Sequence, residues 1–379
     1  MNLIHRHIFA NVFLTCAGAV MLFGFVLVAG NALKELLGPV LAGQLAIGTF
    51  LRLLLLLFPF VFYYALPMGM LTGVLLVLGR MSADREITAL RSSGVSVAWI
   101  SAPIIFLALL GVAAGLVINF QFMPMAKQAS QREFAAAMQQ NPLSFIVPKT
   151  FIRNFPGVVL YVGEMHDRRM KDFWAWELDA QNRVKRSVRA DSGRLDYDAV
   201  NGKFVVTLEN AQGQVRNAKD PEDFSDARGL VAGEKLTVDL ALDRLLGENA
   251  AKRKLKWLTF TQLMAEWMRL SRPDPAMPRE EQQLQLTRVR YTIQEKFATA
   301  FSVLSFALVA IPLGIKISRK ETSANLGLGL MLALSYYFAS VVPGMFDKYP
   351  ELRPDLLVWL PNIIFQGLGL WLFYKIDRA

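Results

Sequence analysis

A short charged segment separates the second and third strongly apolar stretches of the chain, and its residue types are the most informative about chemistry. Asp84 and Glu86 would complement the positive N-terminal end of a short helix. Ser82 can cap such a helix at its start, and Gly94 can terminate it. The pattern predicts a helix over about residues 81–93.

This predicted helix has one small apolar face, because Ile87 and Leu90 lie three residues apart. Two interpretations fit the pattern equally well. In the first, the helix simply lies on a membrane surface. In the second, it is a coupling helix, a short rigid element that docks in a groove of a cytoplasmic ATPase.

The sequence contains no constellation of residues suited to catalysis. His5, His7 and His166 lie on opposite sides of the predicted membrane, so they cannot form a zinc site. There is no phosphate-binding loop of the G-x-x-x-x-G-K-[ST] type, so any ATP must be bound by another chain. The single cysteine, Cys16, excludes a disulfide within the chain. We therefore expect no catalytic residue, metal or cofactor in this chain.

Six stretches are long enough to cross the hydrocarbon core of a bilayer, which needs about 20 apolar residues. None contains a charged residue, whereas a soluble core helix seldom runs so long without a charged face. The first stretch exceeds the roughly 7–15 residue core of a signal peptide, so we expect it to be retained. The predicted spans are residues 8–30, 53–78, 95–120, 297–315, 325–344 and 356–374.

Basic residues in the short loops predict the orientation, because such residues favour the cytoplasm. Both termini are therefore placed in the cytoplasm, and residues from about 121 to 295 lie outside it. This distribution largely explains the net charge of +10, so we expect no nucleic-acid partner. The predicted cytoplasmic side carries nine basic residues, Arg6, Arg80, Arg85, Arg91, Lys316, Arg319, Lys320, Lys375 and Arg378, and the short opposite loops carry four, Lys34, Arg52, Lys348 and Arg353.

The segment outside the membrane is predicted to have three parts. Residues 123–140 are polar and continue the third span as a helix. Residues 145–242 are predicted to form a sandwich, a jelly roll or a half-open barrel, with a two-residue hairpin turn at Asn201-Gly202. Residues 257–295 return to helix and lead into the fourth span. The predicted strands are residues 150–155, 158–162, 173–178, 194–197, 203–208 and 235–240.

The composition of the spans argues against an ion-coupled transporter. Such transporters normally carry ionisable residues at membrane depth, and here the spans offer only amides and hydroxyls. Their prolines are isolated, and isolated prolines in membrane helices are usually plain kinks. A path lined by apolar side chains suits a lipid better than an ion.

Two segments and the overall layout resemble a known family. The charged segment reads Glu86-Ile-Thr-Ala-Leu-Arg-Ser-Ser-Gly-Val-Ser, and the fourth span ends in Pro312-Leu-Gly-Ile. With the three-plus-three arrangement of spans around an outer β-domain, these segments resemble the LptF/LptG permeases of the bacterial lipopolysaccharide exporter over nearly the whole chain. One departure is that Glu295-Lys296 stands where the family has a His-Arg pair at the start of the fourth span.

The resemblance implies a set of partners. Two related permeases would pair in the inner membrane and bind two copies of the LptB ATPase, which would use the ATP. Lipopolysaccharide would enter a central cavity laterally, between the first helix of one permease and the fifth of the other. The outer β-jellyroll would pass the lipid to a periplasmic bridge of similar jellyrolls, LptC and then LptA.

The resemblance also implies site residues. Asp84, Arg85, Glu86 and Leu90 would lie at the contact with the ATPase. Lys34 matches the outer end of the first helix, where the family often has several basic residues that meet the phosphates of the lipid. No basic cluster surrounds Lys34, which could equally be an interfacial anchor.

The expected fold is therefore a membrane α-helical protein with six transmembrane helices and an inserted all-β, jellyroll-like periplasmic domain. Residues 1–122 hold the first three spans, residues 123–295 the periplasmic domain and residues 296–379 the last three spans. The leading hypothesis is the permease subunit of an ATP-driven lipopolysaccharide exporter. The alternative is a membrane-anchored envelope scaffold that presents the β-domain without transport, whereas a lipid-modifying enzyme lacks a nucleophile and base.

Overall fold

The computed structural model shows two compact units, and each is described by itself. One unit consists of Met1–Leu33, Leu53–Ser130 and Lys254–Ala379, and the other of Lys34–Arg52 and Gln131–Arg253. The structure describes residues 3–41, 45–140, 147–152, 157–166, 168–179, 183–198, 203–215, 228–241, 255–273, 277–316, 322–346 and 349–377.

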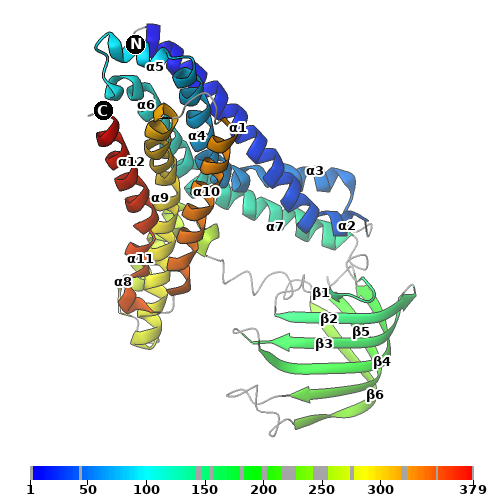
Figure 1. Cartoon of the computed structure of the whole chain (residues 1–379). Helices are drawn as coiled ribbons and strands as arrows, with labels where there is room; N and C mark the ends of the chain where they lie inside the picture. The colour runs from blue at the N-terminus through cyan, green and yellow to red at the C-terminus, as the bar shows by residue number, and fades with distance from the viewer. Residues whose placement is uncertain are drawn as a thin grey trace. The chain divides into compact units, whose positions relative to one another are not determined.

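The described residues contain six helical segments long and apolar enough to cross a membrane, which confirms the six predicted spans (Figure 1). Five of the six segments are longer than the corresponding charge-free runs, because backbone hydrogen bonding continues into the flanking polar residues. They run Leu3–Lys34, Ile47–Ala83, Val97–Phe134, Arg279–Lys316, Gly327–Phe346 and Pro354–Asp377. The helices that form them are α1 (Leu3–Glu35), α3 (Ile47–Leu56), α4 (Phe58–Ala83), α6 (Val97–Val117), α7 (Met123–Gln140), α9 (Arg279–Lys316), α10 (Thr322–Val341), α11 (Pro354–Leu357) and α12 (Leu360–Asp377).

The third span continues beyond its apolar run without a break. After α6 comes a five-residue π-helix, η1 (Ile118–Phe122), and then α7, which ends at Gln140 as predicted. A π-helical turn inserts one extra residue into the helical repeat and so changes which side chains face a neighbouring helix. Here it buries Asn119 and Phe120.

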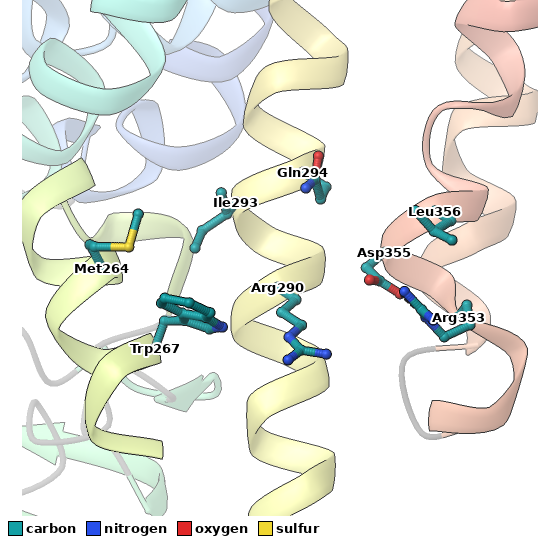
Figure 2. A pocket seen from close by; sticks show the side chains of 8 residues that line it. All are labelled: Met264, Trp267, Arg290, Ile293, Gln294, Arg353, Asp355 and Leu356. Atoms are coloured by element: carbon teal, nitrogen blue, oxygen red, sulfur yellow. Dashed lines mark hydrogen bonds and ion pairs between the residues drawn. The ribbon is translucent and has the colours of Figure 1, made fainter. Parts of the chain in front are cut away.

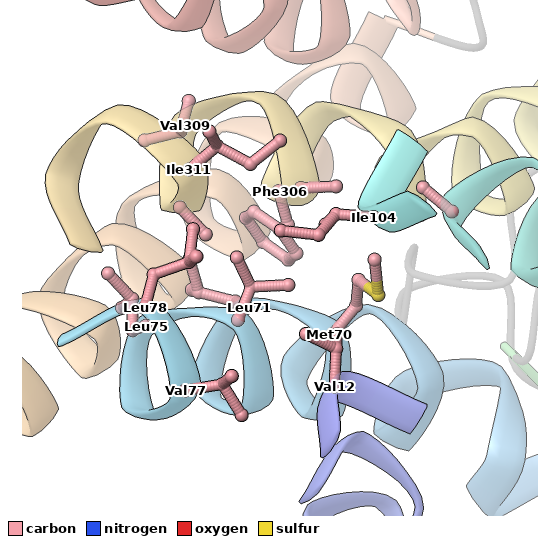
Figure 3. Packing of buried hydrophobic residues seen from close by; sticks show 14 of the residues in the cluster. Val12, Met70, Leu71, Leu75, Val77, Leu78, Ile104, Phe306, Val309 and Ile311 are labelled. Carbon is pink, nitrogen blue, oxygen red and sulfur yellow. The ribbon is translucent and has the colours of Figure 1, made fainter. Parts of the chain in front are cut away.

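Helix α9 lies at the centre of the membrane bundle. In its most apolar stretch 72% of the residues are buried, whereas in the corresponding stretches of α1 and of α10 only 22% are buried. Figure 3 shows Phe306 of α9 packed among Leu71 of α4 and Ile104 of α6. Because lipid tails are as apolar as leucine, van der Waals packing of this kind, rather than hydrophobic transfer, holds membrane helices together.

The other unit contains one antiparallel sheet of six strands in consecutive order, β1 to β6, and Figure 1 shows it strongly curved. Consecutive hairpins correspond to the half-open barrel, one of the three all-β arrangements that the strand pattern allowed. Side chains alternate between two faces, and one face buries Leu160, Val162 and Phe173. The strands are β1 (Phe151–Ile152), β2 (Val158–His166), β3 (Arg169–Leu178), β4 (Val184–Asp198), β5 (Lys203–Val215) and β6 (Arg228–Ala241).

The predicted hairpin lies between β4 and β5. Asp198 pairs with Lys203 in the described part of the sheet. The predicted two-residue turn at Asn201-Gly202 lies outside the described residues, so it stays a prediction.

A short amphipathic helix, α8 (Phe260–Ser271), follows the 3-10 turn η6 (Leu255–Trp257) and precedes α9. Thr259 and Gln262 form a reciprocal capping box at its start, which satisfies backbone donors that the helix leaves free. Leu263 and Leu270 are buried on one side of the helix. On the outer side the Arg269 guanidinium bonds to Glu266 and lowers the pKa of that carboxyl.

Candidate functional site

The predicted coupling segment is a seven-residue helix, α5 (Glu86–Ser92), between α4 and α6. Ile87 is 3% exposed and joins the core of the bundle, while Leu90 is partly buried against the same core. Asp84, Arg85 and Glu86 are exposed. The helix is therefore fastened by its apolar face and presents charged residues outward.

The predicted start of this helix is wrong. Ser82 does not cap it, because α4 continues to Ala83 and the Ser82 hydroxyl donates to the carbonyl of Ile315 at 2.8 Å. The chain turns at Arg85, whose φ of 60° is the left-handed conformation that breaks a helix. Glu86 then occupies the first turn of α5, where its carboxylate complements the helix dipole as predicted.

The predicted end of this helix is confirmed. Gly94 has a φ of +85°, which a residue without a Cβ adopts at no steric cost. The amides of Gly94 and Val95 donate to the carbonyls of Arg91 and Leu90, the paired hydrogen bonds of a Schellman motif. The side chain of Ser96 then caps α6.

Hydrogen bonds connect this end of the bundle to several membrane helices. Ser82 links α4 to Ile315 of α9, as described above. The Arg91 guanidinium of α5 donates to the carbonyl of Ile376 in α12 at 3.3 Å. His5 of α1 lies against Trp99 of α6, with its Nε2 3.0 Å from the Trp99 carbonyl oxygen. Within this end of the bundle α5 is therefore bonded to α12, and the residues that flank α5 are bonded to α9 and α1.

Lys34, the predicted phosphate contact, is not brought together with the coupling segment. It is exposed in the last turn of α1, whereas His5 in the first turn lies beside α6. Arg52 of α3, another basic residue of the short outer loops, forms an ion pair with Glu133, with 3.6 Å between the charged atoms.

Glu295 and Lys296, which stand where the sequence departs from the family pattern, make different contacts. Lys296 is 5% exposed, and its Nζ donates to the backbone carbonyl of Asn119 at 2.6 Å. The Asn119 side chain donates in return to the carbonyl of Lys296 at 3.0 Å. Glu295 instead accepts from Lys256 at 2.8 Å. Lys296 therefore ties α9 to the π-helix η1, a contact that the sequence analysis missed because the two residues are far apart in the chain.

The close approach of α1 and α4 was also missed, although the sequence carries its signal. Gly69 and Gly73 form a Gly-x-x-x-Gly pattern, which lets membrane helices pack with their backbones close together. A Cβ added at Gly73 would lie 2.7 Å from the Cα of Cys16, and one at Gly69 would lie 2.9 Å from the backbone nitrogen of Val20. Only glycine fits at these two positions.

Two of the cavities formed by the described residues lie in the unit that contains Leu53–Ser130 and Lys254–Ala379. The larger, about 560 Å³, is lined by five tyrosines together with residues of α9, α10 and the following 3-10 turn η7 (Val342–Phe346). Three of its phenols already have internal partners: Tyr63 bonds to Thr299, Tyr336 to Asn362, and Tyr337 to the carbonyl of Tyr64. The smaller, about 400 Å³, lies between α8, α9 and α11 (Figure 2).

Among the described residues, no group of three or more histidines, cysteines, aspartates or glutamates is placed to hold a metal ion. The exposed charges of α5 and the apolar faces of α1 and α10 are instead suited to contacts with other molecules. The arrangement can transmit a displacement through the bundle.

Comparisons with known proteins agree with this arrangement. The model of the family described as lipopolysaccharide export system permease LptF/LptG matches residues 6–375. The chain is similar to the lipopolysaccharide export system permease protein LptF of Escherichia coli (strain K12), with 23% identity over 345 residues, covering 89% of this chain and 86% of that protein. The LptF protein of Shigella flexneri is similar to the same extent, with 23% identity over 345 residues.

Proposed function

The chain belongs to the LptF/LptG family of lipopolysaccharide export permeases, and from this premise we propose that it is the permease subunit of an ATP-driven exporter. In this proposal it extracts lipopolysaccharide from the inner membrane and passes it to a periplasmic bridge of LptC- and LptA-like jellyrolls. It pairs with a second permease of the same family, and a separate LptB-like ATPase dimer hydrolyses the ATP. Both termini are cytoplasmic, and the sheet is periplasmic.

The observation that carries the coupling role is the way α5 is held. Ile87 anchors the helix in the core, while Glu86 and its neighbours stay exposed for a partner. Arg91 joins α5 to α12, and Ser82 joins the preceding turn to α9. Because α9 is the most buried helix, movement of the ATPase at α5 would reach the centre of the bundle.

The lateral path proposed for the lipid is supported by the exposure of α1 and α10, the first and fifth spans. Phe25 of α1 is 73% exposed, and Phe338 of α10 is 80% exposed. Large apolar side chains left outside the bundle must contact lipid or another subunit. In the proposed complex they face the second permease and the incoming acyl chains.

The periplasmic role of the sheet is supported by its apolar face. Leu160 and Phe173 are each at most 5% exposed and lie on the same side of the curved sheet. A curved sheet with an apolar interior can shelter acyl chains from water, and this is the property that a lipid conduit needs.

The experiment that tests this function is Glu86→Ala in the chain co-expressed with the second permease and the ATPase. A charge-assisted contact to the ATPase would be lost, so we expect about tenfold weaker ATPase retention on purification, equivalent to one such contact. ATP-dependent release of lipopolysaccharide from proteoliposomes should fall in parallel. Because Glu86 is exposed, elution of the permease as a folded species should be unchanged.

The matched control is Glu164→Ala, which removes an exposed carboxylate from β2. It should retain the ATPase as well as the unaltered chain does. If Glu86→Ala leaves both ATPase retention and lipid release unchanged, α5 is not the coupling element. If the unaltered complex binds no ATPase and releases no lipid, the scaffold function is favoured instead.

A further inference from the structure

The groove between α8, α9 and α11 has an apolar wall contributed by all three helices. Its volume is about 400 Å³. Met264 and Trp267 come from α8, Ile293 from α9 and Leu356 from α11, and Figure 2 shows these side chains around the space between the helices. A wall of this composition fits the apolar part of an amphiphile.

Two guanidinium groups lie at the same groove. Arg290 is exposed on α9, and no carboxylate of the described residues is recorded as its ion-pair partner. Arg353 caps α11 and has its Nε 3.4 Å from the Oδ1 of Asp355, whose side chain is only 10% exposed. Asp355 neutralises the charge of one arginine, so the groove has a net charge of +1. Both planar guanidinium groups still offer hydrogen-bond donors.

The groove also lies at the level where two membrane helices leave the hydrocarbon. The charge-free run of α9 begins at Phe297, and Arg290 precedes it by about two helical turns, roughly 10 Å. The last charge-free run begins at Leu356, three residues after Arg353. Both arginines therefore lie just beyond charge-free runs, on the side where the bilayer passes from hydrocarbon to head groups.

The helix that closes the groove has the character of an interfacial helix. Phe260 is 40% exposed and Met268 is 54% exposed on α8, although the helix also has a buried side. A short amphipathic helix with exposed large apolar residues lies stably in the head-group region. Its position supports the assignment of the groove to that layer.

We propose that this groove binds the head group of an anionic phospholipid of the surrounding bilayer. Arg290 and Arg353 donate to the phosphate oxygens, since a planar guanidinium matches the geometry of phosphate. Trp267, Ile293 and Leu356 contact the glycerol and the upper acyl chains. One net positive charge selects a head group with a net negative charge over a zwitterionic one. The lipid would fasten α8 and α11 to α9.

This site does not depend on the proposed export function, because it requires only that the chain spans a membrane. Lipopolysaccharide also carries phosphate groups, and inorganic phosphate is a similar anion without acyl chains. The probes must therefore separate three sources of phosphate: phosphatidylglycerol, lipopolysaccharide and inorganic phosphate.

The test is thermal unfolding of the purified full-length chain in detergent micelles, with each probe added in turn and phosphatidylcholine as the zwitterionic comparison. Phosphatidylglycerol should raise the unfolding temperature of the unaltered chain, and phosphatidylcholine should not. Arg290→Gln should weaken the apparent affinity for phosphatidylglycerol about tenfold, the effect of one lost charge-assisted contact. Native mass spectrometry should show the same loss of bound phosphatidylglycerol.

The matched control is Arg279→Gln, which removes an exposed arginine from the first turn of the same helix, away from the groove. It should respond to phosphatidylglycerol as the unaltered chain does. The proposal is overturned if phosphatidylcholine or inorganic phosphate stabilises the chain as well as phosphatidylglycerol does. It is overturned as well if Arg290→Gln weakens the response to lipopolysaccharide as much as the response to phosphatidylglycerol, because lipopolysaccharide would then occupy the groove. It is also overturned if Arg290→Gln keeps the full response.

Discussion

At the residue scale, charged side chains near the membrane differ in what their surroundings allow them to do. Lys296 is buried and bonded to the carbonyl of Asn119, so its charge is used inside the chain. Lys34, in the last turn of α1, and Glu86, in the first turn of α5, are exposed and available to partners. Burial, rather than residue type, separates structural charges from those that can recognise another molecule.

Lys34 is predicted to contribute to phosphate recognition. Lys34→Glu replaces an attractive charge by a repulsive one, so binding of lipopolysaccharide should weaken by about tenfold or more, and more so at low salt. The measurement is the amount of lipopolysaccharide that remains bound to the purified chain over a titration. Lys171→Glu, an exposed site on β3, is the control. Unchanged binding by Lys34→Glu would make Lys34 an interfacial anchor only.

At the element scale, the packing of α1 on α4 depends on two glycines that have no room for a side chain. Cys16 and Val20 of α1 lie against Gly73 and Gly69 of α4, and the Cys16 thiol is 3.8 Å from the sulfur of Met70. Close backbone approach increases van der Waals contact, which is the main source of helix association in lipid.

Gly73→Ala is predicted to separate these two helices. Its Cβ would overlap the Cys16 sulfur and lie 2.7 Å from the Cys16 Cα, so α1 must move away. Overpacking of this kind costs about 1–3 kcal/mol, and the unfolding temperature in detergent should fall by several degrees. Gly18→Ala on α1, where a Cβ meets nothing within 4 Å, is the control and should leave the temperature unchanged or raise it. An equal response of the two variants would contradict the close packing at Gly73.

Helix α5 shows which element boundaries local chemistry can specify. Its end was predictable, because glycine is the residue that adopts a positive φ without strain, and Gly94 does so. Its start was not, because Arg85 takes the left-handed conformation at a φ of 60° and Ser82 bonds to Ile315 of a distant helix. The hydroxyl that could have capped α5 is used in a tertiary contact.

At the scale of the whole molecule, the six membrane spans differ in how much of each is buried. Helix α9 is enclosed by the others, whereas only 22% of the most apolar stretch of α1 and of α10 is buried. An enclosed helix determines the stability of the bundle, and exposed apolar helices are surfaces for lipid or for another subunit.

This difference in burial predicts that alanine substitutions of two phenylalanines will affect stability differently. Phe306→Ala on α9 removes a fully buried ring that contacts Tyr336 and Phe365, and should destabilise the chain by about 3 kcal/mol. Phe338→Ala on α10 removes a ring that is 80% exposed, and should leave stability unchanged. In the proposed complex the second variant should instead weaken co-purification of the partner permease. Thermal unfolding and co-purification of both variants check this, and equal destabilisation by the two would contradict the assignment.

The sequence by itself determined the number of spans, the inserted β-domain, the charged segment between the second and third spans, and the family. Each of these depends on local properties: apolar run length, alternation of side chains, and short motifs such as Glu86 to Ser96. The tertiary structure alone decided that α9 is the central helix, that Lys296 bonds to Asn119, and that Arg290 and Arg353 meet at one groove. These facts join residues far apart in the chain, and charge-free apolar spans differ too little in composition to reveal which of their faces meet.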